Sequence, residues 1–306
     1  MRNLLPIIAV LVAILAIWTL AVVPMNIQTA LNQAERAGQA VKPDDGAARR
    51  ATSSFSLIAQ NPTAIAATYG LDRPRLPSPA QVARELWDTT VGKRITSKQS
   101  LIFHGWITLR ATLNGFLLGT ILGVALAVAI VSSRVMELGV MPWAVTSQTI
   151  PIVAIAPMII VLVSATGIEG RGLPKAIIAA YLCFFPVLVS MIKGLRSPDA
   201  MQLDLLKTYS ASPVQVFWKL RVPSSLPYFF ASLKIGIAAA LVGTIVGELP
   251  TGAVRGLGAR ILIGDQFGTP IKIWSALAAT AILAGALVAT LSLLERMVSS
   301  RFGGRA

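Results

Sequence analysis

The chain offers few residues that could carry out covalent chemistry. Its 306 residues include one histidine, His104, and one cysteine, Cys183, so an intrachain disulfide or a cysteine metal cluster is excluded. A metal site or a nucleophilic triad would have to include His104, and neither Gly-x-Ser-x-Gly nor His-Glu-x-x-His surrounds it. Gly92 and Lys93 lack the upstream glycine of a phosphate-binding loop. The sequence therefore predicts a chain that is not an enzyme and does not itself hydrolyse ATP.

Composition indicates a membrane protein. Hydrophobic residues make up 55% of the sequence and charged residues 13%, and the mean hydropathy is +0.70. A soluble domain has about 25% charged residues, roughly twice the share in this chain. The net charge of +14 would also fit a partner such as nucleic acid. Because the basic residues lie between apolar blocks, as they do in integral membrane proteins, we expect contact with membrane lipid and no nucleic acid.

Six apolar stretches have the roughly 20 residues that are needed to cross a bilayer of about 30 Å. They are Leu5–Met25, Leu109–Val131, Trp143–Ser164, Pro174–Ile192, Leu226–Gly247 and Ile273–Leu294. The first, within residues 1–25, is longer than the apolar core of a secretory signal and is interpreted as an uncleaved anchor. The predicted fold is an all-α integral membrane protein with six transmembrane helices.

Basic residues in the short loops predict the orientation of the spans. If the N-terminus lies inside, ten basic residues fall in short cytoplasmic segments and five in short outer loops. The ten are Arg2, Arg134, Lys193, Arg196, Lys207, Lys219, Arg221, Arg296, Arg301 and Arg305, and the five are Arg171, Lys175, Arg255, Arg260 and Lys272. Because Lys and Arg accumulate on the cytoplasmic side, both termini are expected in the cytoplasm.

A long polar segment, residues 26–75, follows the first span and is expected outside the membrane. It has too few apolar residues to offset the entropy cost of ordering a ligand-binding domain, so a tether or a small amphipathic cap is predicted. Ser78 and Pro79 then form the N-cap and first position of a helix. The apolar stripe of that helix, which includes Val82 and Leu86, would lie in the outer interface or pack on the protein itself.

A solute path through the interior would draw on the third and fifth spans. The candidate residues are Thr146, Gln148, Thr149, Met158, Thr244 and Glu248. Glu248 ends the fifth span, where it would line a gate, pair with Arg255 or Arg260, or be solvated at the outer interface. His104 is expected to form hydrogen bonds at the interface, and Cys183 is expected to pack.

Gly115, Gly119 and Gly123 recur every four residues along one face of the second span. Small residues at this spacing let membrane helices approach each other closely. Packing within the chain is favoured over packing between two copies.

The cytoplasmic segment Lys193–Pro223 carries the most informative pattern. Ser212 with Gln215 three residues later forms a capping box, and Pro213 occupies the first helical position. Two short helices are therefore predicted, at about residues 201–209 and 213–220, with a break near residue 210. The second helix places bulky apolar side chains on one side, which would dock on another protein or lie against the membrane interface.

The spacing in this loop resembles the signature of the permease subunits of bacterial ABC importers. That signature is Glu-Ala-Ala, three residues, Gly, nine residues, then Ile-x-Leu-Pro. Asp204, Leu205 and Leu206 fall on Glu-Ala-Ala, Ser210 falls on Gly, and Leu220, Val222 and Pro223 fall on Ile, Leu and Pro. Because serine avoids positive φ, the turn either differs from that of the family or holds Ser210 in a strained left-handed conformation.

Four further segments resemble the nitrate, sulfonate and taurine branch of the binding-protein-dependent transport family. They are Leu76–Val82, His104–Phe116, Ile150–Pro157 and Gly247–Pro250. The resemblance implies a five-helix importer-permease core plus the N-terminal helix, with residues 76–306 as the transmembrane domain. It also implies a location in the bacterial cytoplasmic (inner) membrane.

The resemblance implies partners as well. Two permease chains, expected as a homodimer, form the path, and an extracytoplasmic solute-binding protein delivers the solute. Two cytoplasmic ATPase subunits bind ATP and Mg and receive the coupling loops, so this chain itself is expected to hold no cofactor and no metal. The residues expected to couple to the ATPase, within the 201–223 loop, are Asp204, Leu206, Ser210, Ala211, Val214, Phe217 and Pro223.

The predicted function is that of the membrane-spanning subunit of an ATP-driven importer. The solute would be a sulfonate or taurine, nitrate, or a heterocyclic precursor. The alternative is an ATP-independent secondary transporter or channel, which the loop spacing and the lack of a carboxylate deep within a span disfavour. A membrane enzyme is also disfavoured, because no nucleophile, base or metal cluster is recognisable.

Overall fold

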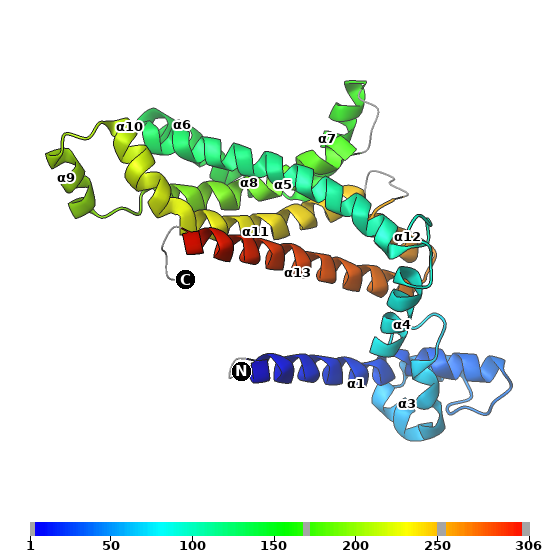
Figure 1. Cartoon of the computed structure of the whole chain (residues 1–306). Helices are drawn as coiled ribbons and strands as arrows, with labels where there is room; N and C mark the ends of the chain where they lie inside the picture. Colours follow the sequence, from blue (N-terminus) through cyan, green and yellow to red (C-terminus); the bar gives the residue numbers. More distant parts are fainter. Residues whose placement is uncertain (1–3, 168–171, 250–254, 302–306) are drawn as a thin grey trace. The chain divides into compact units, whose positions relative to one another are not determined.

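The computed structural model describes residues 4–167, 172–249 and 255–301, and within these ranges it contains helices and no strand (Figure 1). The helices divide into two compact units. The first comprises the described residues up to Ile102 together with Arg260–Ala279, and the second comprises Phe103–Ala259 together with the described residues from Thr280 onward.

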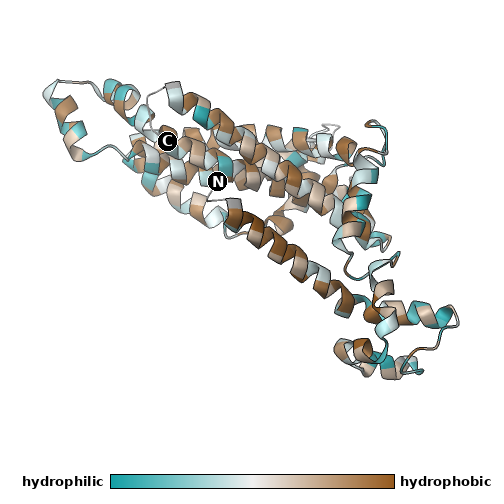
Figure 2. Cartoon of the chain, turned by 60° about the horizontal axis from the view of Figure 1, so that its bottom comes forward, coloured by the Kyte–Doolittle hydropathy of each residue, from teal (hydrophilic) through white to brown (hydrophobic). Residues whose placement is uncertain are grey.

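Five helices in the described part of the chain are long and apolar enough to cross a membrane. They are α1 (Leu4–Arg36), α5 (Leu101–Ser132), α8 (Gly172–Leu195), the helix Pro213–Glu248 and α13 (Pro270–Arg301). Hydrophobic residues cover these helices (Figure 2), and in the most apolar stretches of α1 and α13 almost no residue is buried within the chain. Their apolar surfaces therefore need lipid or another chain to cover them.

The third predicted span is wrong as a single helix. Residues 134–165 form two helices, α6 (Arg134–Ser147) and α7 (Ile152–Ala165), which meet at an angle of 103°. Pro151, at the start of α7, has an extended conformation and directs the preceding residue away from helical geometry. Counted together as one broken span, α6 and α7 bring the number of spans to six.

In the first unit, residues 26–36 of the 26–75 segment continue α1, and the rest of the segment is folded onto the end of that helix. It contains α2 (Gly46–Ala51), α3 (Ser54–Gln60) and two short 3₁₀ turns, η1 (Pro62–Ala64) and η2 (Ala66–Tyr69). The buried side chains of Ile27 and Leu31 on α1 pack against Val41 and Leu57. The buried Asn26 amide donates to the Thr68 and Leu76 carbonyls and accepts from the N–H groups of Arg75 and Leu76. This segment therefore has a small core of its own.

The helix that follows this segment, α4 (Pro79–Thr90), begins as predicted. The Ser78 hydroxyl accepts a hydrogen bond from the Gln81 N–H, and the Gln81 side chain accepts one from the Ser78 N–H. These two bonds complete a capping box, and Pro79 fills the first helical position.

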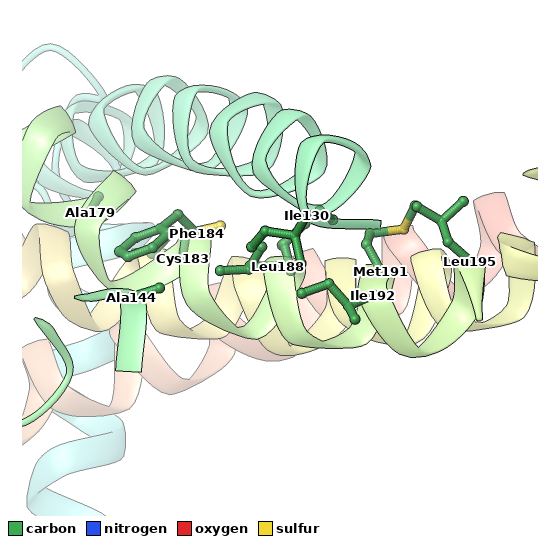
Figure 3. Packing of buried hydrophobic residues seen from close by; sticks show 12 residues of the cluster. Ile130, Ala144, Ala179, Cys183, Phe184, Leu188, Met191, Ile192 and Leu195 are labelled. Carbon is green, nitrogen blue, oxygen red and sulfur yellow. The ribbon is translucent and has the colours of Figure 1, made fainter. Parts of the chain in front are cut away.

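In the second unit, α8 packs between α5 and α11 (Val222–Glu248), and its buried face forms most of the core (Figure 3). A Cβ atom on Gly119 of α5 would lie 2.8 Å from the Ala180 carbonyl oxygen, and one on Gly123 would lie 2.6 Å from that of Phe184. Gly115 is equally close to α8. The three glycines of α5 thus face α8 of the same chain, where the fully buried Cys183 also packs.

The second loop helix and the fifth span, predicted with separate bounds at about residues 213–220 and 226–247, are continuous. The chain runs as one helix of 36 residues from α10 (Pro213–Val216) through a π-helical turn, η3 (Phe217–Arg221), into α11. In that turn the Val222 N–H bonds to the Phe217 carbonyl, five residues back. The longer hydrogen-bond spacing accommodates Pro223, which has no N–H to donate to the ordinary helical partner.

Candidate functional site

The coupling loop, residues 193–223, contains a turn at Ser210. Of the two predicted alternatives for this turn, the structure has the strained left-handed one. Ser210 has φ 52°, in the left-handed region. Its N–H bonds to the Lys207 carbonyl at 2.8 Å, and the Ala211 N–H bonds to the Leu206 carbonyl at 3.0 Å. These two bonds form a Schellman motif at the end of α9 (Ala200–Thr208), in which the left-handed position is usually glycine.

The capping box that starts the next helix is confirmed. The Gln215 N–H donates to the Ser212 hydroxyl at 3.3 Å, and the Ser212 N–H donates to the Gln215 side-chain oxygen at 2.9 Å. The helix starts at Pro213, as predicted, because these bonds satisfy N–H groups that have no partner within the helix.

The coupling loop exposes apolar side chains and borders a groove of about 730 Å³. Val214 and Trp218 are 65% and 64% exposed, whereas Phe217 is half-buried against the core of the second unit. The groove is lined by residues of the loop and by the end of α5: Val128, Val131, Ser132, Leu203, Lys207, Ala211, Pro213, Val214, Val216, Phe217, Trp218 and Arg221. Three of the predicted coupling residues, Ala211, Val214 and Phe217, are thus brought to one surface.

The other predicted coupling residues lie around this groove without lining it. Asp204 is exposed and pairs with Lys207 at 2.8 Å. Leu206 is half-buried, and both Ser210 and Pro223 are exposed.

The residues predicted for a solute path do not form one site in the described chain. Thr146, Gln148, Thr149 and Met158 lie at the α6–α7 bend and on α7, where they are exposed or half-buried. The Thr146 hydroxyl donates to the Pro142 carbonyl and the Thr149 hydroxyl to the Thr146 carbonyl, both of α6. Thr244, by contrast, is fully buried, where it accepts a hydrogen bond from the Thr112 hydroxyl at 3.0 Å.

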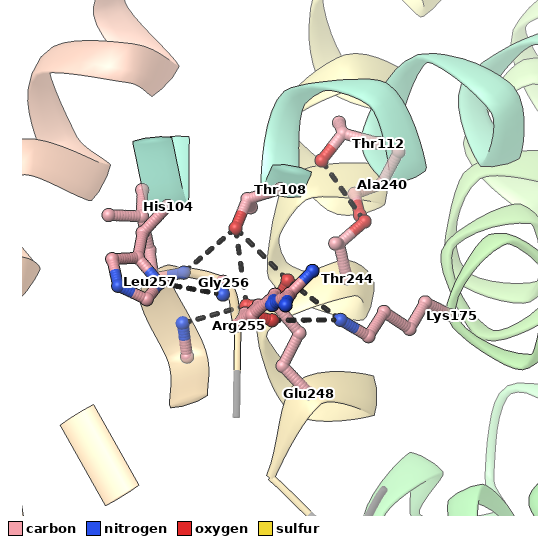
Figure 4. Close-up of polar contacts among 11 residues, drawn as sticks. His104, Thr108, Thr112, Lys175, Ala240, Thr244, Glu248, Arg255, Gly256 and Leu257 are labelled. Atoms are coloured by element: carbon pink, nitrogen blue, oxygen red, sulfur yellow. Dashed lines mark hydrogen bonds and ion pairs between the residues drawn. The ribbon is translucent and has the colours of Figure 1, made fainter. Parts of the chain in front are cut away.

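Glu248 is fully buried, and its partner differs from both predicted ones (Figure 4). Its carboxylate pairs with Lys175 of α8 at 3.3 Å, not with Arg255 or Arg260. The Thr108 hydroxyl donates to the same carboxylate at 3.0 Å. Lys175 is only 4% exposed, so it does not belong to a solvated outer loop as the orientation count assumed. The prediction failed because Lys175 is far from Glu248 in sequence and only the packing of α8 on α11 joins them.

The same cluster of side chains holds the backbone of residues 255–258. The Gly256 N–H donates to His104 Nδ1 at 3.0 Å, the Leu257 N–H to the Thr108 hydroxyl at 2.9 Å, and the Gly258 N–H to the Glu248 carboxylate at 2.8 Å. On the other side, Lys175 Nζ donates to the Arg255 carbonyl at 3.3 Å. We call His104, Thr108, Lys175 and Glu248, together with this backbone, the Glu248 cluster.

The Glu248 cluster caps α12 (Leu257–Gln266) with side chains from other helices. The first N–H groups of a helix have no partner within it, and a carboxylate at that end is favourable. Gly256 has φ +128°, and a Cβ atom there would collide with the Glu248 carboxylate, so the close approach requires glycine.

Sequence reasoning missed most of this cluster, although α5 carries a signal for it. His104, Thr108 and Thr112 recur every four residues, which places three polar groups on one face of an apolar helix. His104 forms hydrogen bonds, as expected, but within the protein, where it is 2% exposed. Arg2, Arg171 and Arg305 of the orientation count, and Pro250 of the Gly247–Pro250 segment, lie outside the described residues.

The helices of membrane length define a multi-pass membrane protein, and comparisons with known proteins give its family. Residues 116–304, more than half of the chain, match the family described as "Binding-protein-dependent transport system inner membrane component". The chain belongs to this family and is an ABC transporter permease. The lack of a carboxylate deep within a span was one argument against an ATP-independent transporter, and the burial of Glu248 removes that argument. The family match now argues against such a transporter instead.

Several transport permeases are similar to this chain. A riboflavin transport system permease protein of Chloroflexus aurantiacus is 38% identical over 73% of this chain and 79% of its own length. A formylaminopyrimidine transport permease protein of Halalkalibacterium halodurans is 36% identical over 60% and 68% of the two chains. A putative aliphatic sulfonates transport permease protein of Bacillus subtilis is 25% identical over 67% and 72%. These relatives are named as transport permeases and not as enzymes, which supports a transport subunit without enzymatic activity. The family implies an ATPase and a solute-binding protein as partners.

Proposed function

We propose that this chain forms the solute path of an ATP-driven importer and that its coupling loop docks on a separate ATPase subunit. Two copies would form the path as a homodimer, and ATP and Mg would bind to the two ATPase subunits. The observation that carries the proposal is the exposed apolar surface of the loop, with Val214 and Trp218 beside the groove. Water disfavours such a surface, whereas a partner protein would bury it.

The length of the loop's helix favours a protein partner over the membrane interface. The helix Pro213–Glu248 has 36 residues and is therefore about 54 Å long. The hydrocarbon core of a bilayer is only about 30 Å thick. When α11 spans that core, its α10 end projects beyond it, where an ATPase in the cytoplasm can reach Ala211 and Val214.

We place the protein in the bacterial inner membrane with the coupling loop and both termini in the cytoplasm. This orientation rests on the excess of Lys and Arg in the loops on that side. A reporter fused after Arg301 and active only in the cytoplasm would test it. Activity restricted to the opposite compartment would reverse the orientation.

For the solute, we propose a nitrogen heterocycle. The two relatives with 36% and 38% identity are named for riboflavin and formylaminopyrimidine, both of which are nitrogen heterocycles. The relatives named for sulfonates and taurine are 25% and 29% identical. The preference for a heterocycle over a sulfonate is tested by measuring uptake of labelled riboflavin in the presence of unlabelled riboflavin, an aminopyrimidine or taurine. Uptake of labelled taurine, unaffected by either heterocycle, would replace the heterocycle with a sulfonate.

Ala211→Arg tests the coupling role, because it places a long charged side chain in the groove. We expect co-purification of the ATPase and solute uptake both to fall roughly tenfold or more, the scale of an interface hot spot. Ala47→Arg is the matched control, since Ala47 is exposed on α2 in the other unit. Normal co-purification and uptake in Ala211→Arg would refute the docking site.

Val214→Asp adds a second test on the exposed face of the helix. Phe217→Asp would also place a charge beside the groove, but Phe217 packs against the core and lies edge-on to Trp218, with ring centroids 5.4 Å apart. Val214→Asp therefore separates docking from folding more cleanly.

Uptake that persists without ATP in the unaltered protein would favour the ATP-independent transporter instead.

A further inference from the structure

The coupling loop and the Glu248 cluster lie at opposite ends of one helix. The helix Pro213–Glu248 begins beside the groove and ends at the carboxylate that holds residues 255–258. Pro223 and Pro227 have no N–H to donate near the α10 end, but the chain stays helical throughout, and from Pro227 to Glu248 consecutive hydrogen bonds make a stiff connector. A displacement of the α10 end therefore changes the position of Glu248 as well.

Helix α8 is packed so tightly on this helix that the two form one unit. A Cβ atom on Gly243 of α11 would lie 2.8 Å from Ala179 Cα, and one on Gly194 of α8 would lie 3.0 Å from Ser225 Cβ. Contacts this close leave no room for one helix to slide past the other without repacking. Lys175, on α8, therefore follows the movement of Glu248, on α11.

The contacts of the Glu248 cluster pass this movement to the backbone beyond the helix. Lys175 holds the Arg255 carbonyl and Glu248 holds the Gly258 N–H, while His104 and Thr108 of α5 hold the two N–H groups between them. Apolar residues of similar volume could fill this space without loss of stability. What the ion pair adds is a defined set of hydrogen bonds to the segment.

We propose that Lys175 and Glu248 act in transport as positioning residues. They join the helix Pro213–Glu248 to the segment 255–258 and so set the position of that segment. Movement of the coupling loop reaches this segment through the joint, so the segment changes position when the ATPase subunits bind ATP. The proposal rests on the importer function proposed above, and it assigns a role to a buried ion pair that docking of the ATPase does not use.

A double variant, Lys175→Met with Glu248→Gln, tests the joint. It removes both charges together, so no buried charge is left unpaired, and the glutamine keeps an oxygen for the Gly258 N–H. We expect the ATPase to co-purify as with the unaltered chain, while uptake falls roughly tenfold or more, the scale of an ordinary coupling between two sites. Arg134→Met with Glu137→Gln is the matched control, because that pair lies at the surface of α6, with side chains 75% and 25% exposed, and the glutamine keeps an oxygen for Arg196. Uptake within about twofold of the unaltered chain would overturn the proposal.

A spin label measures the movement directly and does not depend on how well the double variant folds. The one native cysteine, Cys183, is fully buried, so a label attaches selectively to an introduced Arg255→Cys, whose side chain is exposed. We expect trapping with ATP, Mg and vanadate to change the spectrum of this label in the complex. The double variant should not show this change, and neither should a control label at Phe55→Cys, a residue of α3 that is 76% exposed.

The two proposals fail in different ways. A chain that never associates with an ATPase subunit refutes the importer function. A chain that associates and takes up solute with ATP, but whose label at residue 255 does not respond to trapping, refutes only the joint.

Discussion

Two ion pairs lie in opposite surroundings, one in the coupling loop that precedes the helix Pro213–Glu248 and one at the far end of that helix. At the coupling loop, Asp204 and Lys207 lie 2.8 Å apart and their side chains are 68% and 75% exposed. At the other end, Glu248 and Lys175 lie 3.3 Å apart and their side chains are 0% and 5% exposed. Water solvates either partner of the exposed pair when the other is removed, but it cannot reach the buried pair. The exposed end can therefore exchange contacts with a partner, whereas the buried end depends on one geometry.

The ends also differ in how far apart in sequence their contacts lie. The hydrogen bonds that form the turn around Ser210 and the capping box after it join residues three to five positions apart, such as Ser212 and Gln215. The bond between Gly256 and His104 joins residues 152 positions apart. Disturbing the loop should therefore have local effects, whereas disturbing the Glu248 cluster should affect the packing of α5, α8 and α11 together.

The largest effect should come from removing one charge of the buried pair. Glu248→Leu leaves the Lys175 ammonium buried without its counter-ion and should destabilise the protein by about 3–5 kcal/mol. Asp204→Asn removes the matching charge of the exposed pair and should cost about 1 kcal/mol or less. Thermal melting of both variants in detergent measures the difference. Equal shifts in melting temperature would contradict the contrast between the two ends.

A smaller effect should follow from filling the contact between α5 and α8. Gly119→Ala places a Cβ atom 2.8 Å from the Ala180 carbonyl oxygen, and overpacking of this kind costs about 1–3 kcal/mol. Gly105→Ala on the same helix meets no atom within 4 Å and should stabilise the helix by about 0.5–1 kcal/mol. The two melting temperatures should therefore move in opposite directions. A shift in the same direction would show that α5 does not pack on α8 through this face.

The smallest effect should be a gain at the coupling loop. Ser210→Gly relieves the left-handed strain and should stabilise the turn by about 1 kcal/mol. Gly268 occupies the same position after α12, with φ 58° and the same two Schellman hydrogen bonds, so Gly268→Ser should lose a comparable amount. Melting curves of the two variants provide the measurement. Destabilisation by Ser210→Gly would mean that the serine hydroxyl contributes more than the strain costs.

Much of the fold followed from local patterns in the chain. Five of the six predicted spans are helices of membrane length, because a long apolar run has few other ways to satisfy its backbone in a bilayer. The break at Pro151 and the continuity through Pro223 were not predictable in the same way. A proline in an apolar run is compatible with a bend, a break or a π-helical turn, and the surrounding packing decides among them.

The sequence by itself determined the features that depend on neighbouring residues. The capping boxes at Ser78 and Ser212 result from hydrogen-bonding preferences within a few residues, whereas for Ser210 the sequence left both a different turn and a strained left-handed conformation open. Only the tertiary structure decided that Glu248 pairs with Lys175 and that His104 is buried against Gly256. Burial removes water as the alternative partner, so each polar group must bond to whichever group the packing of three helices places beside it.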